Sequence, residues 1–238
     1  MIRFKPYLEF KYPVSFEQKD LFLSEVIGFL KSDQNGNNGV YRVSSVYFDT
    51  KNFDFFYDKI EGEFYKIKIR LRRYCLDSNN VWSSPKLELK IKKGNETIKI
   101  SKKLSFEQEQ YFLNNSILLT DLLELFNESS IPTEKLSGKV FYPVVDVVYR
   151  REAYTFDYLP GTRVTFDSKI FVTNKHVLKE YKTCFDNTPL YFPDYHEILE
   201  IKSNTIVPEF LILPLQNIGV TKENISKYGI AVERFFEL

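Results

Sequence analysis

The sequence predicts a mainly β protein of the α+β class, in which strands with one charged face surround a charged interior. The first observation is a stretch in which cationic and apolar side chains alternate, as on a strand with two unlike faces. Its cations are Lys66, Lys68, Arg70 and Arg72, and its apolar residues are Ile67, Ile69 and Leu71. The second is recurrence: Lys86–Lys92 shows the same alternation, as do segments around Phe10, Val164 and Leu199.

Such a strand needs an anionic partner or open water. Cations two positions apart lie roughly 6.6 Å from each other and repel by about 2.5 kcal/mol at an effective dielectric near 20. Taken alone, the pattern is most simply a solvated face of an antiparallel sheet. Its recurrence on several segments favours one charged surface assembled from many strands.

About eight strands of this kind can be arranged in two ways. An open sheet would expose the charged face, whereas closure into a barrel turns it inward and leaves the apolar face for helices outside. Closure removes the sheet edges and accounts for the helices. We therefore expect an eight-stranded antiparallel β-barrel tunnel whose charged lumen holds water or a polyanion.

The first half of the chain gives clear boundaries. Ser15 and Gln18 form a capping-box pattern ahead of a helical apolar period, and Ser105 with Gln108 repeats it. Gly94 and Asn95 mark a tight hairpin. The expected strands are Leu8–Tyr12, Val40–Asp49, Glu63–Tyr74, Pro85–Lys93 and Glu96–Lys102, and the expected helices are Ser15–Lys31, one starting at Ser105, and Thr120–Asn127.

The second half returns to strands. Leu159-Pro-Gly161 predicts a hairpin between two of them. The expected strands are Pro143–Tyr149, Glu152–Tyr158, Gly161–Asp167 and His196–Ser203, and helices are expected around Asn174–Tyr181 and Lys222–Gly229.

The bulk properties bound the class of protein. The 238 residues suit a single domain over 1–238, and 33 Lys plus Arg against 32 Asp plus Glu exclude a polycation that coats nucleic acid. Charges in Met1–Val14 exclude an apolar signal core, and Phe210–Leu215 is too short to span a membrane. Cys75 and Cys184 lack a paired spacing, so we expect reduced thiols in the cytoplasm.

Few residues suit nucleophilic or zinc chemistry. The two histidines, His176 and His196, have no Ser or Cys beside them in a known motif, and no glycine-rich phosphate loop occurs. Phosphate would therefore be held by Arg and Lys side chains. The carboxylates predicted to face inward, Glu9, Glu88 and Glu200, suit Mg²⁺ or Mn²⁺. Ion pairs of Glu88 with Lys90 and of Glu200 with Lys202 are an equal alternative.

The order of the charged motifs resembles a known family. The motifs are Glu9-Phe-Lys11-Tyr12, Tyr47-Phe-Asp49, Arg70-Leu-Arg72-Arg-Tyr74, Leu87-Glu-Leu-Lys90, Tyr149-Arg-Arg151-Glu-Ala153-Tyr154, Arg163-Val-Thr-Phe-Asp167, Leu199-Glu-Ile-Lys202 and Ser226-Lys-Tyr228. Nearly the whole chain is similar to the polymerase domain of the vacuolar transporter chaperones, a branch of the triphosphate tunnel metalloenzymes that includes stand-alone bacterial proteins. The resemblance implies transfer of the terminal phosphate of ATP to inorganic polyphosphate, with Mn²⁺ or Mg²⁺.

The resemblance also implies roles for particular residues. The catalytic set is Arg70, Arg72, Lys90, Arg151, Arg163 and Glu200; by resemblance Lys11, Lys102 and Lys227 bind substrate and Glu200 is a metal ligand. Inward parity, rather than the resemblance, adds Lys68 and Lys202 to the substrate-binding residues and Glu9 and Glu88 to the metal ligands. Lys102 shares a strand face with Ile98 and Ile100, because residues two apart point the same way, and this would turn it outward. Its assignment to the tunnel therefore requires a β-bulge, and Lys103 is the alternative. Lys66 and Lys68 are expected at the tunnel mouth.

Two departures from the family pattern affect the expected function. Related tunnel triphosphatases begin with two glutamates and a lysine at alternate positions, whereas Tyr7 replaces the first glutamate here. Its loss disfavours hydrolysis, although a tunnel triphosphatase and a module that only binds polyphosphate remain alternatives. The sequence also lacks the phosphate-sensing and membrane modules of the fungal complexes. We therefore expect no membrane insertion by this chain, and export would need a membrane partner encoded elsewhere.

Overall fold

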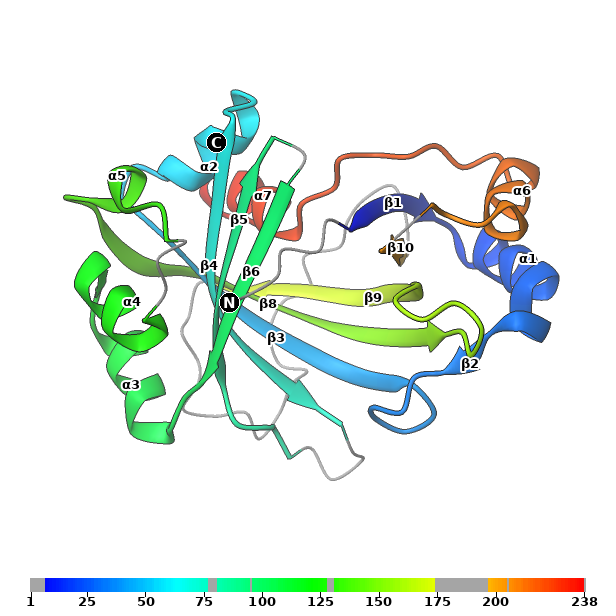
Figure 1. Ribbon diagram of the computed structural model, residues 1–238, viewed down its shortest axis with the longest axis horizontal. Coiled ribbons are helices and arrows are strands. Elements are labelled where there is room, and N and C mark those ends of the chain that lie inside the picture. Colours follow the sequence, from blue (N-terminus) through cyan, green and yellow to red (C-terminus); the bar gives the residue numbers. More distant parts are fainter. Residues whose placement is uncertain are drawn as a thin grey trace.

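One antiparallel sheet dominates the computed structural model, which describes residues 7–76, 81–94, 96–127, 131–173, 197–204 and 206–237 (Figure 1). Its main strands follow the order β1-β10-β9-β8-β3-β4-β5-β6. Their bounds are β1 Leu8–Val14, β3 Val40–Asp49, β4 Tyr65–Cys75, β5 Lys86–Lys93, β6 Glu96–Lys103, β8 Val140–Thr155, β9 Arg163–Thr173 and β10 Glu197–Ser203. Two short strands, β2 (Lys31–Ser32) and β7 (Ile117–Leu118), pair with β8.

The sheet curls strongly, so that β4, β5 and β6 run across the direction of β8 and β9 (Figure 1). Within the described part of the chain, the edge strands β1 and β6 do not pair with each other. The architecture is therefore a half-barrel with a concave and a convex face. The predicted mainly β fold with an eight-stranded antiparallel wall and helices packed around it is confirmed.

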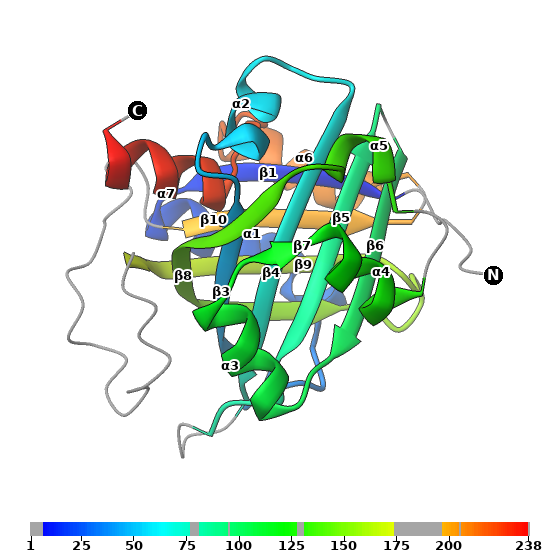
Figure 2. The ribbon, with the colours of Figure 1, turned by 90° about the vertical axis from the view of Figure 1, so that its left-hand side faces the viewer.

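The apolar positions of β4 and β5 face the convex side. Ile67, Ile69 and Leu71 are buried there, in one core with Leu87 and Leu89 of β5. Figure 2 shows three helices over these strands, namely α3 (Phe106–Asn114), α4 (Leu119–Phe126) and α5 (Thr133–Leu136). Because residues two apart share a face, burial of this apolar row directs the alternating cations to the concave side.

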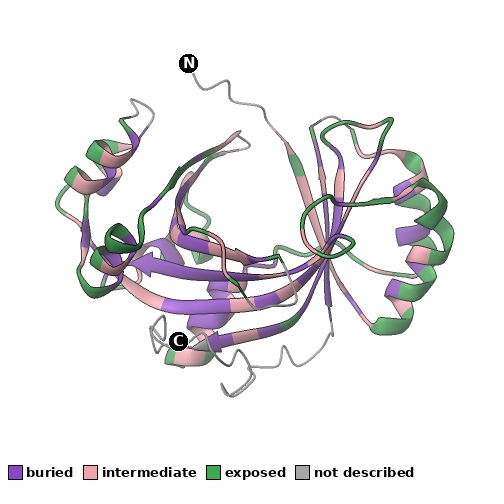
Figure 3. Ribbon diagram, turned by 90° about the horizontal axis from the view of Figure 1, so that it is seen from below, coloured by how far each residue is buried: buried purple, intermediate pink, exposed green. Residues whose placement is uncertain are grey.

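A second convex core lies at the other end of the sheet. Val164 and Phe166 of β9 pack with Leu199 of β10 beneath Phe22 and Leu211. The last two belong to α1 (Phe16–Val26) and α6 (Glu209–Asn217). Exposed residues gather on the helices and connecting segments, whereas the strands are largely buried (Figure 3).

The third core lies on the concave side, where α7 (Lys227–Phe236) meets α2 (Asp54–Ile60). Tyr228 of α7 stacks on Tyr47 of β3 with ring centroids 5.1 Å apart, and its hydroxyl donates to Asp49. The Asp49 carboxylate also accepts the backbone N–H groups of Phe55 and Phe56 at the start of α2. These contacts attach both helices to one end of the curl.

Most predicted elements are confirmed, including both capping boxes and the hairpins at Gly94 and Gly161. Three predictions are wrong. The first helix ends at Val26, before a 3₁₀ turn over Ile27–Phe29. The expected strands 143–149 and 152–158 are one strand, because a register shift against β9 near Arg150 absorbs the irregularity without a break. The last helix starts at Lys227 rather than at Lys222.

Three described helices, α2, α5 and α6, were not predicted, and the helix expected at 174–181 lies outside the described residues. Among the helices described, none combines the length and the apolar character needed to cross a membrane.

Candidate functional site: a cationic concave face

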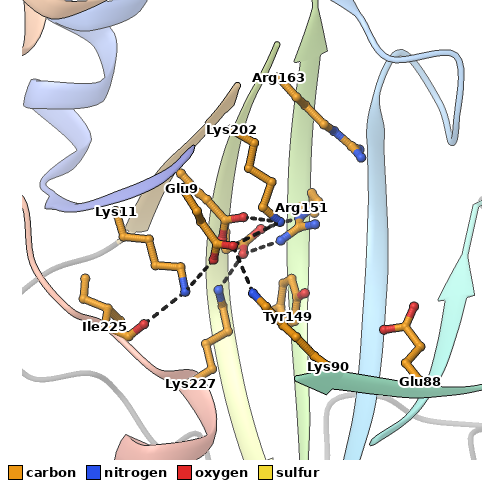
Figure 4. Close-up of polar contacts among 12 residues, drawn as sticks. Glu9, Lys11, Glu88, Lys90, Tyr149, Arg151, Arg163, Lys202, Ile225 and Lys227 are labelled. Atoms are coloured by element: carbon orange, nitrogen blue, oxygen red, sulfur yellow. Dashed lines mark hydrogen bonds and ion pairs between the residues drawn. The ribbon is translucent and has the colours of Figure 1, made fainter. Parts of the chain in front are cut away.

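The concave face joins charged side chains from strands that are distant in sequence (Figure 4). The sheet register places Lys11 opposite Glu200, Glu9 opposite Lys202, and Arg151 opposite Asp167. Opposite charges facing each other across strands stabilise a sheet. Residues from β1, β8, β9 and β10 therefore form one cluster, which Lys90 of β5 and Lys227 of α7 complete.

Glu9 lies at the centre of this cluster. Its carboxylate is 3.1 Å from the ammonium groups of both Lys11 and Lys90 and 4.0 Å from that of Lys202. Burial and the charge of Glu200 raise the pKa of Glu9, but the lysines outweigh both and lower it to about 2. Glu9 is therefore ionised at neutral pH.

Glu200 is the second carboxylate of the cluster. It is 5% exposed and its Oε1 lies 2.5 Å from Nζ of Lys202. Burial acts to raise its pKa, but Lys202 and Lys11 hold the pKa well below the usual range. Burial in turn acts to lower the pKa of Lys11, but Glu200 and Glu9 raise it above its ordinary value. The cluster therefore contains two fixed negative charges among several fixed positive ones.

Asp167 is a residue of the site that the sequence prediction omitted. It is completely buried, accepts two hydrogen bonds from Arg151 at 2.6 and 2.7 Å, and contacts Nζ of Lys227 at 2.6 Å. Burial opposes its ionisation, but Arg151 and Lys227 lower its pKa. The sequence could have indicated Asp167, because it alternates with the apolar residues of its strand in the same way as Arg163 and Thr165 and so faces inward.

A second group occupies the β4–β5–β6 side. Glu88 is 2% exposed and contacts Arg70 at 2.7 Å and Lys99 at 2.5 Å, while Arg72 lies 3.8 Å away. Burial raises the pKa of Glu88, but Arg70 and Arg72 lower it far below its ordinary value. The expected ion pair with Lys90 is replaced by Arg70, which is the cross-strand neighbour of Glu88.

Tyrosine hydroxyls orient three arginines. Arg70 donates to Tyr47 at 3.4 Å and Arg72 to Tyr149 at 3.4 Å. Arg163 donates to Tyr41 at 2.5 Å. A guanidinium bonded in this way retains further donors for a second partner. The sequence prediction did not assign these tyrosines to the site, although all three have inward parity.

In the described part of the chain, the residues fit a divalent ion best between Glu9 and Glu200. Glu9 and Glu200 supply two ionised carboxylates, and the hydroxyl of Thr165, opposite Glu200 in the sheet, is buried without a hydrogen-bond partner in the described chain. Mg²⁺ is commonly held by one or two carboxylates plus substrate phosphates. Glu88 does not fit, because arginines and Lys99 occupy its oxygens and it lies apart from Glu9 (Figure 4). Nowhere in the described residues do three or more potential protein ligands gather.

Two lysines lie where the prediction did not put them. Lys102 is exposed opposite Leu87, on the convex face of Ile98 and Ile100, and the β5–β6 register is regular. Its assignment to the tunnel is therefore wrong, because no bulge reverses the parity. Lys68 is only partly exposed and donates to Ser226 Oγ at the start of α7, rather than projecting freely at a mouth. Lys99, which was not predicted, lies inward on β6.

A cavity of about 430 Å³ opens at the end of the concave face away from α7. Its lining includes Tyr41, Tyr74, Lys103, Arg151 and Arg163. Nη2 of Arg163 lies 2.9 Å from Asp33, while its buried Nε has no hydrogen-bond partner among the described residues. The cavity thus combines aromatic surface with available guanidinium donors.

Cations outnumber carboxylates on the whole concave face. Among the described residues, the cations are Lys11, Lys66, Lys68, Arg70, Arg72, Lys86, Lys90, Lys92, Lys99, Lys103, Arg151, Arg163, Lys202 and Lys227, and the carboxylates are Glu9, Asp33, Glu88, Asp167 and Glu200. Only an anion of several charges could neutralise such a surface locally.

Comparisons with known proteins agree with this geometry. The chain matches the family model described as VTC domain over residues 5–236. No curated protein matches the chain.

Solved structures share the fold at low sequence identity. A protein of Pyrococcus horikoshii OT3 is 15% identical with a TM-score of 0.51, covering 96% of this chain and 99% of its own. A candidate adenylate cyclase from Vibrio parahaemolyticus is 12% identical with a TM-score of 0.51, covering 96% and 98%. A candidate adenylyl cyclase from Hippeastrum, described as having a dominant triphosphatase activity, is 14% identical with a TM-score of 0.52, covering 96% and 95%.

Proposed function

The chain belongs to the VTC domain family, and on this premise we propose that it is an ATP-dependent polyphosphate polymerase. It transfers the terminal phosphate of ATP to a growing inorganic polyphosphate chain, with Mn²⁺ or Mg²⁺. The observation that supports transfer over hydrolysis is the surroundings of Glu9. Tyr7 lies beside it, with its ring 5.5 Å from Nζ of Lys90 and 5.9 Å from Nζ of Lys202. An aromatic ring thus takes the place where another carboxylate could activate water.

The cations hold the triphosphate in this proposal. Arg70, Arg72 and Arg163, each oriented by a tyrosine, bind phosphate oxygens through their remaining donors. Lys90 and Lys11 release the Glu9 carboxylate and bind phosphate oxygens instead. The flexible side chain of lysine allows its ammonium group to change partners in this way. Arg151 is held by Asp167 and positions that side of the site.

Glu200, together with Glu9, would hold the divalent ion. Such an ion neutralises charge on phosphate oxygens and orients them. Glu88 has a different role, since it orients Arg70 from the side opposite the substrate. Lys202 and Lys227 remain substrate-binding candidates, because each contacts a single carboxylate closely and retains donors.

The reaction is a phosphoryl transfer. An oxygen of the terminal phosphate of the chain attacks the γ-phosphorus of ATP, the bond to the β–γ bridging oxygen breaks, and ADP leaves. Such a reaction requires positioning and charge neutralisation rather than covalent help from the protein. The excess of cations on the concave face supports this requirement.

The second candidate is a tunnel triphosphatase, in which water replaces the chain as the attacking group. The activity described for the Hippeastrum protein favours it, although 14% identity relates the two chains by fold alone. The third candidate is a module that binds polyphosphate without catalysis. The ionised carboxylates Glu9 and Glu200 favour an active site over simple binding, since two carboxylates together suit a divalent ion.

One assay separates the three candidates. Purified protein is incubated with ATP and Mn²⁺, with and without a short polyphosphate primer, and polymer and free phosphate are both measured. We expect polymer that forms faster with primer. Free phosphate without polymer would contradict the proposal and favour the triphosphatase, while polyphosphate binding without either product would favour the module.

The proposed partners are ATP and inorganic polyphosphate, in the cytoplasm, with no nucleic acid. The near-neutral net charge of +1 supports the last point. A membrane partner encoded elsewhere would be needed to move polymer across a membrane.

A further inference from the structure

One part of the concave face violates the rule of opposite charges across strands. The register pairs Lys66 with Lys92, Lys68 with Lys90, and Lys90 with Lys99. Like charges directly opposite each other destabilise a sheet. We call Lys66, Lys68, Lys90 and Lys92 the lysine strip; its members lie on adjacent strands and run from Glu9 toward the Gly94 hairpin.

The lysine strip has little negative charge around it. Within the described residues, no carboxylate lies within 4.0 Å of the ammonium of Lys66, Lys68 or Lys92, and the hydrogen-bond partner of Lys68 is Ser226 Oγ at 3.0 Å. Burial and the charges of Lys11 and Lys90 lower the pKa of Lys68 well below its ordinary value. Among the described residues, Lys90 is therefore the one member of the strip with a carboxylate partner, Glu9, and cations exceed carboxylates along the rest of it.

A further cation points to the same place. Lys59 of α2 lies close to Gly229 of α7, where an added Cβ would be 3.3 Å from Nζ of Lys59. Burial lowers the pKa of Lys59, the charges of Lys11 and Lys66 add to the effect, and Glu233 opposes it. Gly229 thus leaves space for a cation between α7 and the strip.

The two ends of the concave face differ in chemistry. The cavity away from α7 offers the rings of Tyr41 and Tyr74 beside arginines, which suits a ligand with a planar base as well as phosphate. The lysine strip presents flexible ammonium groups at every second position of two strands. Movable point charges without directional demands suit a long phosphate chain that has to slide.

We propose that polyphosphate leaves the site along the lysine strip toward the Gly94 hairpin, and that Lys66 and Lys92 are binding residues for the distal part of the chain. This inference rests on the proposed function. It also assigns a direction to the tunnel, with the nucleotide at the cavity and the polymer at the end near α2 and α7.

The test compares a long ligand with a short one. The double variant Lys66→Glu with Lys92→Glu is titrated with long-chain polyphosphate and with tripolyphosphate at one fixed salt concentration. We expect at least about a tenfold loss of affinity for the long chain, a weaker salt dependence, and less than about a twofold change for tripolyphosphate. The milder double variant Lys66→Gln with Lys92→Gln should show the same selectivity with a smaller loss, and it preserves the test should the first variant misfold.

The matched control is Lys93→Glu with Lys102→Glu, which makes the same charge change on the convex face of neighbouring strands. A third pair, Lys86→Glu with Lys103→Glu, changes the cavity end, where these lysines also face each other. Equal long-chain affinity in the strip variant and the convex control would overturn the inference, as would a loss confined to the cavity pair. If the unmodified protein binds neither ligand, the proposed function itself fails.

Discussion

Arg72 and Arg73 are adjacent in sequence but lie on opposite faces of β4, so replacing each by alanine separates phosphate binding from stability. Arg72 is 7% exposed; its Nε donates to Ser45 Oγ at 3.0 Å, and the nearest carboxylate oxygen, on Glu88, is 3.8 Å away. The Arg72 guanidinium therefore retains N–H donors that can bind a phosphate oxygen. Arg73 instead forms an ion pair on the convex side with Glu109 of α3, which is completely buried.

We expect Arg72→Ala to remove a charge-assisted contact worth roughly 1.5–3 kcal/mol, which corresponds to a fall in kcat/KM for ATP of about 10- to 150-fold. The free energy of unfolding should change little, because loss of Arg72 also relieves repulsion from Arg70. Arg73→Ala should have the opposite profile. It leaves Glu109 buried and unpaired at a cost of about 3–5 kcal/mol, with kcat/KM per folded molecule unchanged.

Initial rates of polymer formation at several ATP concentrations and urea unfolding curves measure the two effects. A third variant, Arg72→Lys, keeps the charge without the planar fork and should recover only part of the lost activity. Wild-type kcat/KM in Arg72→Ala would refute the assignment of this arginine to the substrate. A fall in Arg73→Ala as large as that in Arg72→Ala would show that stability, not contact, governs the rate.

Three further results are expected. Glu200→Gln should raise the Mn²⁺ concentration for half-maximal activity at least about tenfold while tripolyphosphate still binds, and an unchanged Mn²⁺ titration would exclude Glu200 as a ligand. Because the pKa of Glu9 falls from 4.5 to about 2 on folding, its contribution to stability is complete above pH 4.5 and is lost as the pH drops toward 2. The urea midpoint should therefore fall between pH 4.5 and about pH 2, and a constant midpoint over this range would contradict the ion pairs. A bound polyanion should raise the depressed pKa of Lys68, so that binding at alkaline pH takes up as much as about one proton. Calorimetry in buffers of different ionisation enthalpy detects this proton uptake, and the variant Lys68→Met should abolish it.

The faces of β4 and β5 could be predicted because most of their outward positions are filled by apolar residues, which the convex core buries. Ile67, Ile69 and Leu71 allow only one orientation of β4, and with it Arg70 and Arg72 point inward. Charge alternation thus predicted both the curl of the sheet and most of the cations that line it. Alternation with Ile98 and Ile100 also predicted correctly that Lys102 faces outward. The resemblance to the family motif, which placed Lys102 in the tunnel, gave the wrong face.

What the sequence did not reveal depends on contacts between distant segments. The start of α2 is capped by the Asp49 carboxylate from the preceding strand, so no local capping motif announces the helix. In α6, Pro214 lies inside the helix and argues against it locally, but burial of Leu211 and Leu215 against the sheet outweighs this preference.

The partners of the site residues were equally hidden. That Glu88 faces Arg70 rather than Lys90 follows from the β4–β5 register, and the register cannot be read from either strand alone. The contact between Lys227 and Asp167 joins α7 to β9 across 60 residues. Parity shows which residues face inward, but only the folded chain shows which of them meet.

The most direct test of the central claim follows the terminal phosphate of ATP. Purified protein with Mn²⁺ and a short polyphosphate primer is given ATP labelled at the γ-phosphate or, in a parallel reaction, at the α-phosphate, and long polymer is separated from nucleotides and free phosphate. We expect γ-label in the polymer, none from the α-position, and one ADP for each phosphate added. Recovery of the γ-label as free phosphate, with an unlabelled primer of unchanged length, would contradict the claim.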